Sequence, residues 1–185
     1  MRYLTLKNFD KQKNPVVIKT IVTTELVEKI AKNHGAEVIN TLTGFKYIGE
    51  QIGILEKNEE LPRFLFGVEE SCGYLIGPYV RDKDAIGAAM LVCEMAASLK
   101  KQGKTILNAL QELYETYGYY LAHVQSIELS GADAMDKAAK IMADLRQNTP
   151  KTIGGQKVTI VKDYLSRTST NLIENSQEEI SLPKS

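Results

Sequence analysis

The sequence predicts an α/β fold, a layered sandwich in which a mostly parallel sheet is flanked by helices, followed by an incomplete α+β segment. Three observations predict it. Strand and helix patterns alternate with short links in the first half of the chain, which favours parallel pairing through right-handed crossovers. Each expected strand there ends in polar residues. After residue 118 the pattern changes, and the rest of the chain has too few strands and apolar residues to form a second hydrophobic core.

The first expected strand is VVIKTIV, residues 16–22, because it is rich in β-branched side chains. A helix follows it. Thr24 can cap this helix, Glu25 and Glu28 suit its positive N-terminal end, and Gly35 can close it in the left-handed conformation.

Two more strands are expected, AEVIN at residues 36–40 and FLFGV at residues 64–68. Between them, residues 41–52 form a loop that leads into a brief helix. A long helix starts at Asp82 or Asp84 and runs to Gly103. Its apolar residues lie almost all round, which predicts packing against the sheet on one side and a helix on the other. A further helix is capped by Thr105 and ends at residue 118.

The second half begins with an extended connector, residues 119–130. An amphipathic helix starts at Asp133 or Asp136, and GGQK at residues 154–157 is typical of the turn before a strand, VTIV. Residues 131–165 therefore resemble βαβ material with too few strands for a core. Residues 166–185 are mostly polar, and we expect them to be flexible.

Composition narrows the class of protein. Of the 185 residues, 43% are hydrophobic and 25% charged, with 23 basic and 23 acidic side chains, so the net charge is zero. That balance argues against a nucleic-acid or anionic-membrane partner, and no apolar run is long enough to span a bilayer. We therefore expect a cytoplasmic protein. Its two cysteines, Cys72 and Cys93, are expected to be reduced, small and buried.

The polar strand ends predict a binding site. In an open parallel sheet, ligands bind at the carboxyl ends of the strands. Carboxylates and hydroxyls bind sugar hydroxyls, whereas lysine and arginine hold phosphate. The mixture here favours a phosphorylated polyol, since no glycine-rich phosphate loop is present. The polar residues at the three strand ends and the charged cluster that returns beside them are Lys19, Thr20, Thr41, Thr43, Gly44, Lys46, Glu69, Glu70, Ser71, Arg81, Asp82, Lys83 and Asp84.

Four segments together resemble one enzyme family. GVEESCGYL (residues 67–75) is similar to the Gly-Glu-x-Ser-Gly sugar-binding loop of the α-D-phosphohexomutases, the phosphoglucomutase and phosphomannomutase family. TGFKYIG (43–49) resembles the family's Thr-Gly loop, and RDKDA (81–85) its Arg-x-Lys-Asp-Gly segment. VIKTIVTTEL (17–26) resembles the start of its third domain. The segments occur in the family's order, and the resemblance covers residues 15 to 120.

The resemblance implies roles for six residues. Glu69 and Ser71 would bind the sugar's third and fourth hydroxyls, and Thr43 with Gly44 would position the ring. Lys83 would approach the reacting end, and Lys19 would lie near the path of the phosphate. Histidines that some relatives carry are replaced here by Phe45 and, near the cysteine, Tyr74, so no histidine role transfers.

The resemblance also implies a domain division. Residues 1–14 would be a lead-in and residues 15–120 the sugar-binding third domain. Residues 121–185 would be a connector and the truncated start of the C-terminal phosphate-binding domain.

The family interconverts hexose 1-phosphate and hexose 6-phosphate through a phosphoserine and a bisphosphate intermediate. Its phosphoserine loop, Asp-rich magnesium loop and Arg-Pro-Ser-Gly-Thr-Glu-Pro loop do not occur in this sequence. The resemblance thus implies a fragment with no catalytic residue and no metal ligand of its own, inactive alone. Mg²⁺ would bind elsewhere in the full-length enzyme, and the partners would be a hexose phosphate and the other domains of the polypeptide.

Other interpretations stay open. The enzyme could be a phosphopentomutase of the same family, or the chain a stand-alone sugar-phosphate-binding module. An unrelated nucleotide-binding domain is the weakest alternative, because it needs a phosphate loop. Glu69 and Glu70 could also be a solvated pair, and Lys83 could merely pair with Asp82 or Asp84. The sequence leaves the sugar and the oligomeric state undecided.

Overall fold

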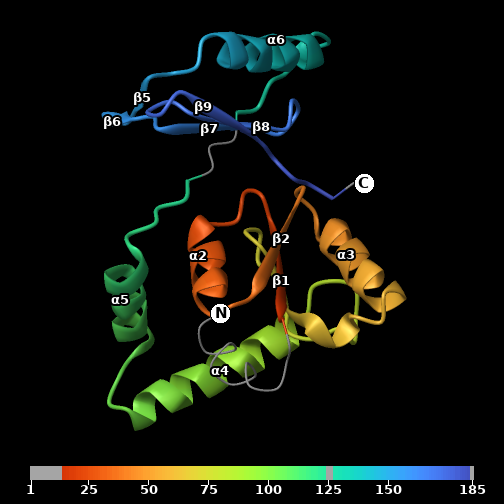
Figure 1. Ribbon diagram of the computed structural model, residues 1–185, viewed down its shortest axis with the longest axis vertical. Helices are drawn as coiled ribbons and strands as arrows, with labels where there is room; N and C mark the ends of the chain where they lie inside the picture. Colours follow the sequence, from red (N-terminus) through yellow and green to blue (C-terminus); the bar gives the residue numbers. More distant parts are fainter. Residues whose placement is uncertain (1–13, 124–126, 184–185) are drawn as a thin grey trace. The chain divides into compact units, whose positions relative to one another are not determined.

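The computed structural model describes residues 14–123 and 127–183, which divide into two compact units. Of the described residues, the first unit comprises 14–122 and 183, and the second comprises 123 and 127–182. The first unit contains the expected α/β sheet (Figure 1). In the described part of the chain, no helix is both long and apolar enough to cross a membrane.

The sheet of the first unit has four strands in the order β2-β1-β3-β4. They are β1 (Val16–Thr20), β2 (Glu37–Thr41), β3 (Phe64–Glu69) and β4 (Gly73–Leu75). β1 pairs with both β2 and β3 in parallel, as predicted. β4 was not predicted and pairs antiparallel to β3. It escapes a pattern search because it is three residues long.

Helices cover both faces of this sheet. They are α2 (Glu25–Asn33), α3 (Phe45–Lys57), α4 (Ala85–Lys101) and α5 (Ile106–Tyr117), with a short 3₁₀ turn, η2, at Leu61–Arg63. α2 and α3 lie on opposite faces (Figure 1). The first strand is shorter than predicted, because a turn at residues 20–23 ends it, and α3 is longer than the brief helix expected.

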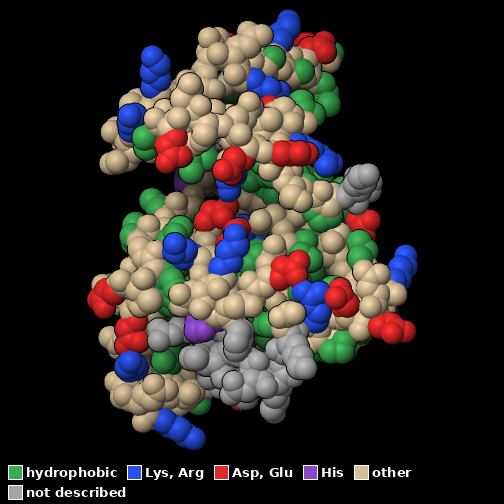
Figure 2. All heavy atoms as spheres, in the orientation of Figure 1, with side chains coloured by type: hydrophobic (Ala, Val, Ile, Leu, Met, Phe, Trp, Pro, Cys, Tyr) green, Lys and Arg blue, Asp and Glu red, His purple; other side chains and the backbone are tan. Residues whose placement is uncertain are grey.

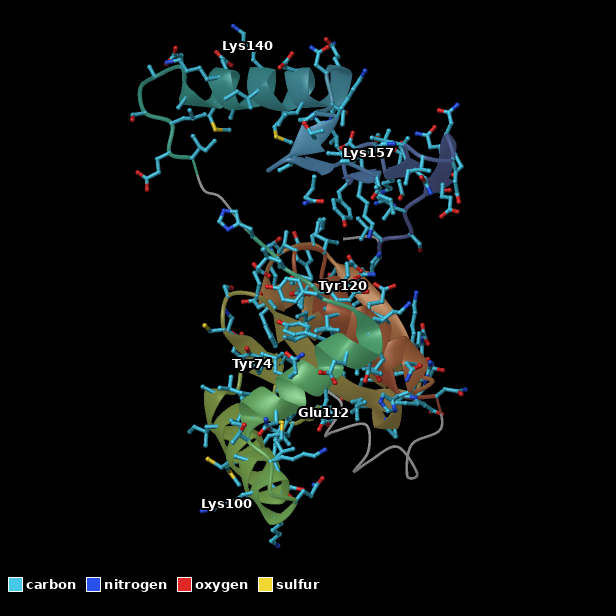
Figure 3. All side chains as sticks on the ribbon, turned by 90° about the vertical axis from the view of Figure 1, so that its left-hand side faces the viewer. Tyr74, Lys100, Glu112, Tyr120, Lys140 and Lys157 are labelled. Carbon is cyan, nitrogen blue, oxygen red and sulfur yellow. The ribbon has the colours of Figure 1, made fainter. Side chains whose placement is uncertain are left out.

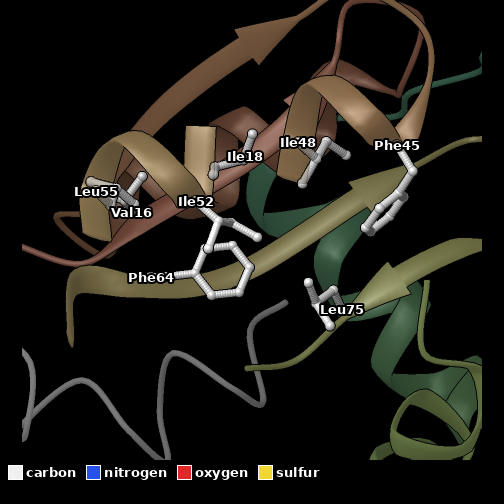
Figure 4. Close-up of a cluster of buried hydrophobic side chains, with 8 residues drawn as sticks. All are labelled: Val16, Ile18, Phe45, Ile48, Ile52, Leu55, Phe64 and Leu75. Carbon is white, nitrogen blue, oxygen red and sulfur yellow. The ribbon is translucent and has the colours of Figure 1, made fainter. Parts of the chain in front are cut away.

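The two faces of the sheet have separate apolar cores. On the α3 face, β1, α3, β3 and β4 contribute Val16, Ile18, Phe45, Ile48, Ile52, Leu55, Phe64 and Leu75 (Figure 4). On the other face, a second cluster joins β1 and β3 to α2, with partly buried Leu91 of α4 beside it. Alternation along β1 produces this division, since neighbouring side chains of a strand point to opposite faces. The same alternation determines to which face of the sheet each side chain at the end of the strand points.

α4 contacts β4 and α5, but it is far more exposed than the predicted packing on two sides implies. Only Gly87 is buried in this helix, whereas Ile86 is 78% exposed and Met90 is 68% exposed. Leu91 packs beside the second core, and the helix otherwise follows β4. Its last turn carries Lys100, which Figure 3 labels together with Tyr74 of β4.

The second unit combines one helix with short antiparallel strands. α6 (Ala134–Gln147) is followed by the hairpin β5 (Thr152–Ile153) and β6 (Gln156–Lys157). A three-stranded sheet follows, made of β7 (Ile160–Asp163), β8 (Thr168–Asn171) and β9 (Ser176–Glu179). All its pairings are antiparallel, so the expected βαβ arrangement is wrong.

We expected residues 166–185 to be flexible, and the structure has β8 and β9 within this segment. Polar residues can form these strands because the pairing uses backbone groups, which every non-proline residue has. Among the described residues of the second unit, none is buried. Acidic and basic side chains are interspersed on the face of each unit that Figure 2 shows.

Candidate functional site

The polar ends of β1, β2 and β3 lie at one edge of the sheet. Thr20 is the register partner of Thr41, and Lys19 is the partner of Val68, one residue before Glu69. Thr41 Oγ1 also donates a hydrogen bond of 3.5 Å to the carbonyl oxygen of Lys19. The carboxyl ends of the three parallel strands therefore share one rim, which is where this architecture binds ligands.

A tight turn follows β3 and brings two predicted site residues together. Glu69 pairs with Gly73 across the β3–β4 ladder, so residues 70–72 form the turn. Cys72 has φ of +56°, a left-handed conformation that turns the chain sharply. Ser71 Oγ then donates a hydrogen bond of 2.9 Å to Glu69 Oε1. A hydroxyl and a carboxylate are thereby fixed side by side.

Glu69 is less open than a rim position implies, because its side chain is only 3% exposed. It packs beside Phe45, the first residue of α3, and over Gly73. A Cβ at position 73 would overlap Cγ of Glu69 and come within 2.9 Å of the Phe45 ring. Glu69 Oε2 is buried and has no hydrogen-bond partner within the described part of the chain. An unpaired buried carboxylate oxygen is unfavourable, so this atom is ready to accept a donor.

Lys83 completes this group. Its ammonium forms an ion pair with Glu69 Oε1 and donates to the carbonyl oxygen of Ser71 at 3.5 Å. The hydrogen bond to Glu69 raises the pKa of Lys83 above its ordinary value. The neighbouring acids have other partners: Asp82 accepts from the backbone N–H of Lys83, and Asp84 caps α4 through Gly87 N at 3.0 Å. Lys83 therefore does not merely pair with these two acids.

Thr43 and Gly44 form the loop before α3. Gly44 precedes this helix with φ of +123°, which a residue with a side chain adopts only with strain. Thr43 is exposed at the rim. The following residue, Phe45, is 5% exposed and contacts the Glu69 region, so this loop is tied to the β3–β4 turn. Lys46 lies with its ammonium 4.8 Å from the centre of the Tyr47 ring.

Lys19 lies apart from the Glu69 group. Its side chain is fully buried, and its ammonium donates to the carbonyl oxygens of Thr23 at 3.1 Å and Thr20 at 3.4 Å. Glu25 Oε1 is 3.7 Å away. In β1, Lys19 shares the face of Val17 rather than that of Ile18, which is why it turns toward α2. The structure uses it to order the loop between β1 and α2.

Known proteins match both the sequence and the fold of this chain. A sequence profile described as phosphoglucomutase/phosphomannomutase, alpha/beta/alpha domain III, matches residues 1–117, more than half of the chain. The chain belongs to the phosphoglucomutase/phosphomannomutase family. It matches this family through the unit that carries the Glu69 group.

Two curated relatives show the extent of the match. A phosphoglucomutase of Staphylococcus aureus (strain bovine RF122 / ET3-1) is 36% identical over 170 residues, which is 92% of this chain and 30% of that protein. One from Staphylococcus haemolyticus (strain JCSC1435) is 38% identical over 169 residues, 91% of this chain and 30% of that protein. The chain thus spans about a third of these relatives.

Solved structures of the family share the fold. A putative phosphomannomutase from Thermus thermophilus aligns with a TM-score of 0.50 at 26% identity, covering 63% of this chain and 24% of that one. Parafusin, a phosphoglucomutase from Paramecium in an open form, aligns with a TM-score of 0.56 over 95% of this chain and 29% of that one. At 17% identity, the second likeness shows the fold alone.

Sequence reasoning left Glu70 without a role and expected buried cysteines. Glu70 Oε2 in fact accepts a hydrogen bond of 2.8 Å from Thr20 Oγ1. The sequence could have indicated this separate role, since neighbouring side chains of a strand point to opposite faces and two adjacent acids at its end therefore point in different directions. Cys72 and Cys93 are both free but exposed, so the expectation that they are buried is wrong. Cys72 lies in the turn, and Cys93 lies in α4.

The acids at this rim do not fit a magnesium ion. In the described ranges, no group of three or more His, Cys, Asp or Glu side chains could hold a metal. Glu69 is paired with Lys83, and Glu70 bonds Thr20 instead of converging with Glu69. Mg²⁺ prefers several converging oxygen ligands, and an adjacent ammonium would repel it. These residues therefore do not form a magnesium site.

Proposed function

We propose that this chain is the sugar-recognising part of a phosphoglucomutase or phosphomannomutase that interconverts hexose 1-phosphate and hexose 6-phosphate. One observation carries the proposal. Within the described ranges, Glu69 Oε2 is a buried acceptor that no other group hydrogen-bonds, and its carboxylate is bonded to the hydroxyl of Ser71 and the ammonium of Lys83. A sugar hydroxyl is the donor that such an oxygen lacks.

The chemistry of this group suits a polyol. Glu69 accepts hydrogen bonds, Ser71 both donates and accepts, and Lys83 donates only. Two adjacent sugar hydroxyls can each donate to one acceptor and accept from one donor here. A hydrogen bond to a charged group contributes about 1.5–3 kcal/mol, so Glu69 is the principal contact in this account.

The contacts of Glu69 and Ser71 with the sugar can be used in both phosphoryl-transfer steps of the proposed reaction. The resemblance implies a bisphosphorylated sugar that turns over and presents its other phosphate to a phosphoserine elsewhere in the enzyme. Two neighbouring equatorial hydroxyls can occupy one carboxylate–hydroxyl site in either orientation. The chain would therefore supply recognition, and Thr43 with Gly44, at the same rim, would position the ring. Lys19, buried under the rim, would support the loop instead of meeting the phosphate.

Catalysis requires the rest of the polypeptide in this proposal. The serine and magnesium loops that the resemblance implies would lie outside this sequence, since no such motif occurs in it. Residues 15–120 would be the third domain, and residues 121–185 the connector and first part of the next domain.

The test is an activity assay on the full-length polypeptide that contains this chain, with the 185-residue chain alone as its control. We expect the full-length protein to convert glucose 1-phosphate or mannose 1-phosphate to its 6-phosphate, and the chain alone to be inactive. Ribose 1-phosphate tests the phosphopentomutase alternative. Turnover of ribose 1-phosphate with neither hexose phosphate converted would contradict the proposal.

A further inference from the structure

Glu70 connects the turn after β3 to the end of β1. Its Oε2 accepts a hydrogen bond of 2.8 Å from Thr20 Oγ1, and 50 positions separate the two residues in the sequence. Glu70 is the first residue of the turn, directly between Glu69 and Ser71. Its side chain is exposed, so it contributes no apolar packing to the core. Its contribution is a hydrogen bond that joins the turn after β3 to the end of β1.

The Thr20 end of this link is firmly held. Thr20 is fully buried, and Thr23 is 6% exposed. The two hydroxyls lie 2.8 Å apart. Because the single hydroxyl proton of Thr20 goes to Glu70, the hydroxyl of Thr23 must donate to Thr20. Lys19 in turn donates to the carbonyl oxygens of both threonines, which fixes the turn that presents them.

At the other end of the link, the turn after β3 needs an unusual backbone conformation. Ser71 must fold back so that its hydroxyl reaches Glu69 at 2.9 Å, and Cys72 must take a left-handed conformation of φ +56°. A non-glycine residue in that conformation is unfavourable unless its surroundings hold it there. The hydrogen bond from Thr20 to Glu70 is a side-chain restraint on this turn from outside the hairpin.

We propose that Glu70 is a positioning residue for sugar recognition. Through Thr20 it holds the turn in the form in which Glu69 and Ser71 converge. The role rests on the proposed function of the Glu69 group. When only a fraction of the molecules is competent to bind, the apparent affinity falls by that fraction. Loss of the link should therefore raise KM and leave kcat nearly unchanged.

The first arm of the test needs no activity. Hydrogen–deuterium exchange of the backbone amides of residues 70–73 is measured in the 185-residue chain. The variants are Glu70→Ala, Thr20→Val, their combination and Glu70→Gln, with Glu50→Ala on the exposed side of α3 as the control. Thermal melts exclude variants that unfold.

We expect Glu70→Ala and Thr20→Val each to accelerate exchange about threefold or more. Thr20→Val also removes the acceptor of the Thr23 hydroxyl. The combination should exchange no faster than Thr20→Val alone, since both changes remove the hydrogen bond between Thr20 and Glu70. Glu70→Gln keeps an acceptor oxygen and should behave like the wild type. Two results would contradict the claim that the Thr20–Glu70 hydrogen bond restrains the turn. One is an unchanged exchange rate in both single variants, and the other is a combined variant whose acceleration is the product of the two single accelerations.

The second arm uses the full-length polypeptide with glucose 1-phosphate. Glu70→Ala should raise KM about tenfold with kcat nearly unchanged, and Glu70→Gln should restore KM. Faster exchange with an unchanged KM would overturn the positioning role while leaving the proposed function intact. If the wild-type enzyme converts no sugar phosphate, the proposed function is wrong. The hydrogen–deuterium exchange experiment then still tests whether the Thr20–Glu70 hydrogen bond restrains the turn.

Discussion

The ammonium of Lys83 pairs with the carboxylate of Glu69, although β4 lies between them in the sequence. The pair uses Oε1, the oxygen that also accepts from Ser71, and among the described residues Oε2 is buried without a hydrogen-bond partner. Both partners of the carboxylate thus use the same oxygen. A hydroxyl that donates to Oε2 need not replace either of them.

Glu69→Gln tests recognition with little change in volume. We expect kcat/KM of the full-length enzyme to fall about 10- to 100-fold, because hydrogen bonds from sugar hydroxyls to a charged acceptor become hydrogen bonds to a neutral one. Glu50→Gln on the exposed side of α3 is the matched control. Steady-state kinetics and thermal melts are measured on both. A lowered Tm with kinetics like those of the control would show that Glu69 is only structural.

Gly73→Ala tests the close packing around the carboxylate. The new Cβ would overlap Glu69 and lie 2.9 Å from the buried ring of Phe45, so overpacking should destabilise the chain by about 1–3 kcal/mol. Activity should fall as well, because Glu69 must move. Gly53→Ala in α3 meets no atom within 4 Å and should instead stabilise by about 0.5–1 kcal/mol. Denaturant titration compares the two variants, and equal stabilities would refute the packing argument.

Asp84 gives a prediction about pH. The backbone N–H of Gly87 and then the hydroxyl of Tyr79 lower the pKa of Asp84 below its ordinary value of 3.8. A carboxyl with a lowered pKa stabilises the fold above its unfolded pKa, and this contribution is lost as the pH falls through the folded value. Asp84→Asn should lower Tm by about 2–5 °C at pH 7, and by progressively less below pH 3.8.

Thermal melts between pH 7 and pH 3 measure this difference. Asp82→Asn removes a charge two residues earlier without changing the cap of α4 and is the control. A difference between Asp84→Asn and the wild type that stays constant at every pH would contradict the assignment of Asp84 as a charged cap.

Magnesium should not bind the chain with structural affinity. The acids of the rim are paired with Lys83 and Thr20 and do not converge. Calorimetric titration of the 185-residue chain with magnesium chloride should show no site in the micromolar range. A saturable micromolar site would contradict this view of the rim.

Local signals made much of the first unit predictable. Thr24 and Thr105 cap α2 and α5 as expected, since capping depends on residues within one turn. The β-branched strand at residues 16–20 and its parallel partners follow from alternation with helices. The shared rim follows from parallel pairing alone, which is why Thr43 and Glu69 could be assigned to one edge.

Features that depend on contacts between distant segments could not be predicted. The burial of Glu69 depends on Phe45 of α3 and on Gly73 of a strand too short to detect. The partners of Lys19 are carbonyl oxygens of the turn after β1, and the strand pattern does not show where that turn begins. β8 and β9 pair through backbone groups, so their polar side chains carry little pattern.

The central claim is that Glu69 recognises a sugar hydroxyl, and a substrate lacking that hydroxyl tests it most directly. We would measure kcat/KM for glucose 1-phosphate and for its 3-deoxy analogue in the wild-type full-length enzyme and in Glu69→Gln. The wild type should prefer glucose 1-phosphate by about 10- to 100-fold, and Glu69→Gln should lose much of that preference, because the missing hydroxyl removes the hydrogen bond that the missing charge weakens. An undiminished preference in Glu69→Gln would show that the hydroxyl is recognised elsewhere and would contradict the assignment.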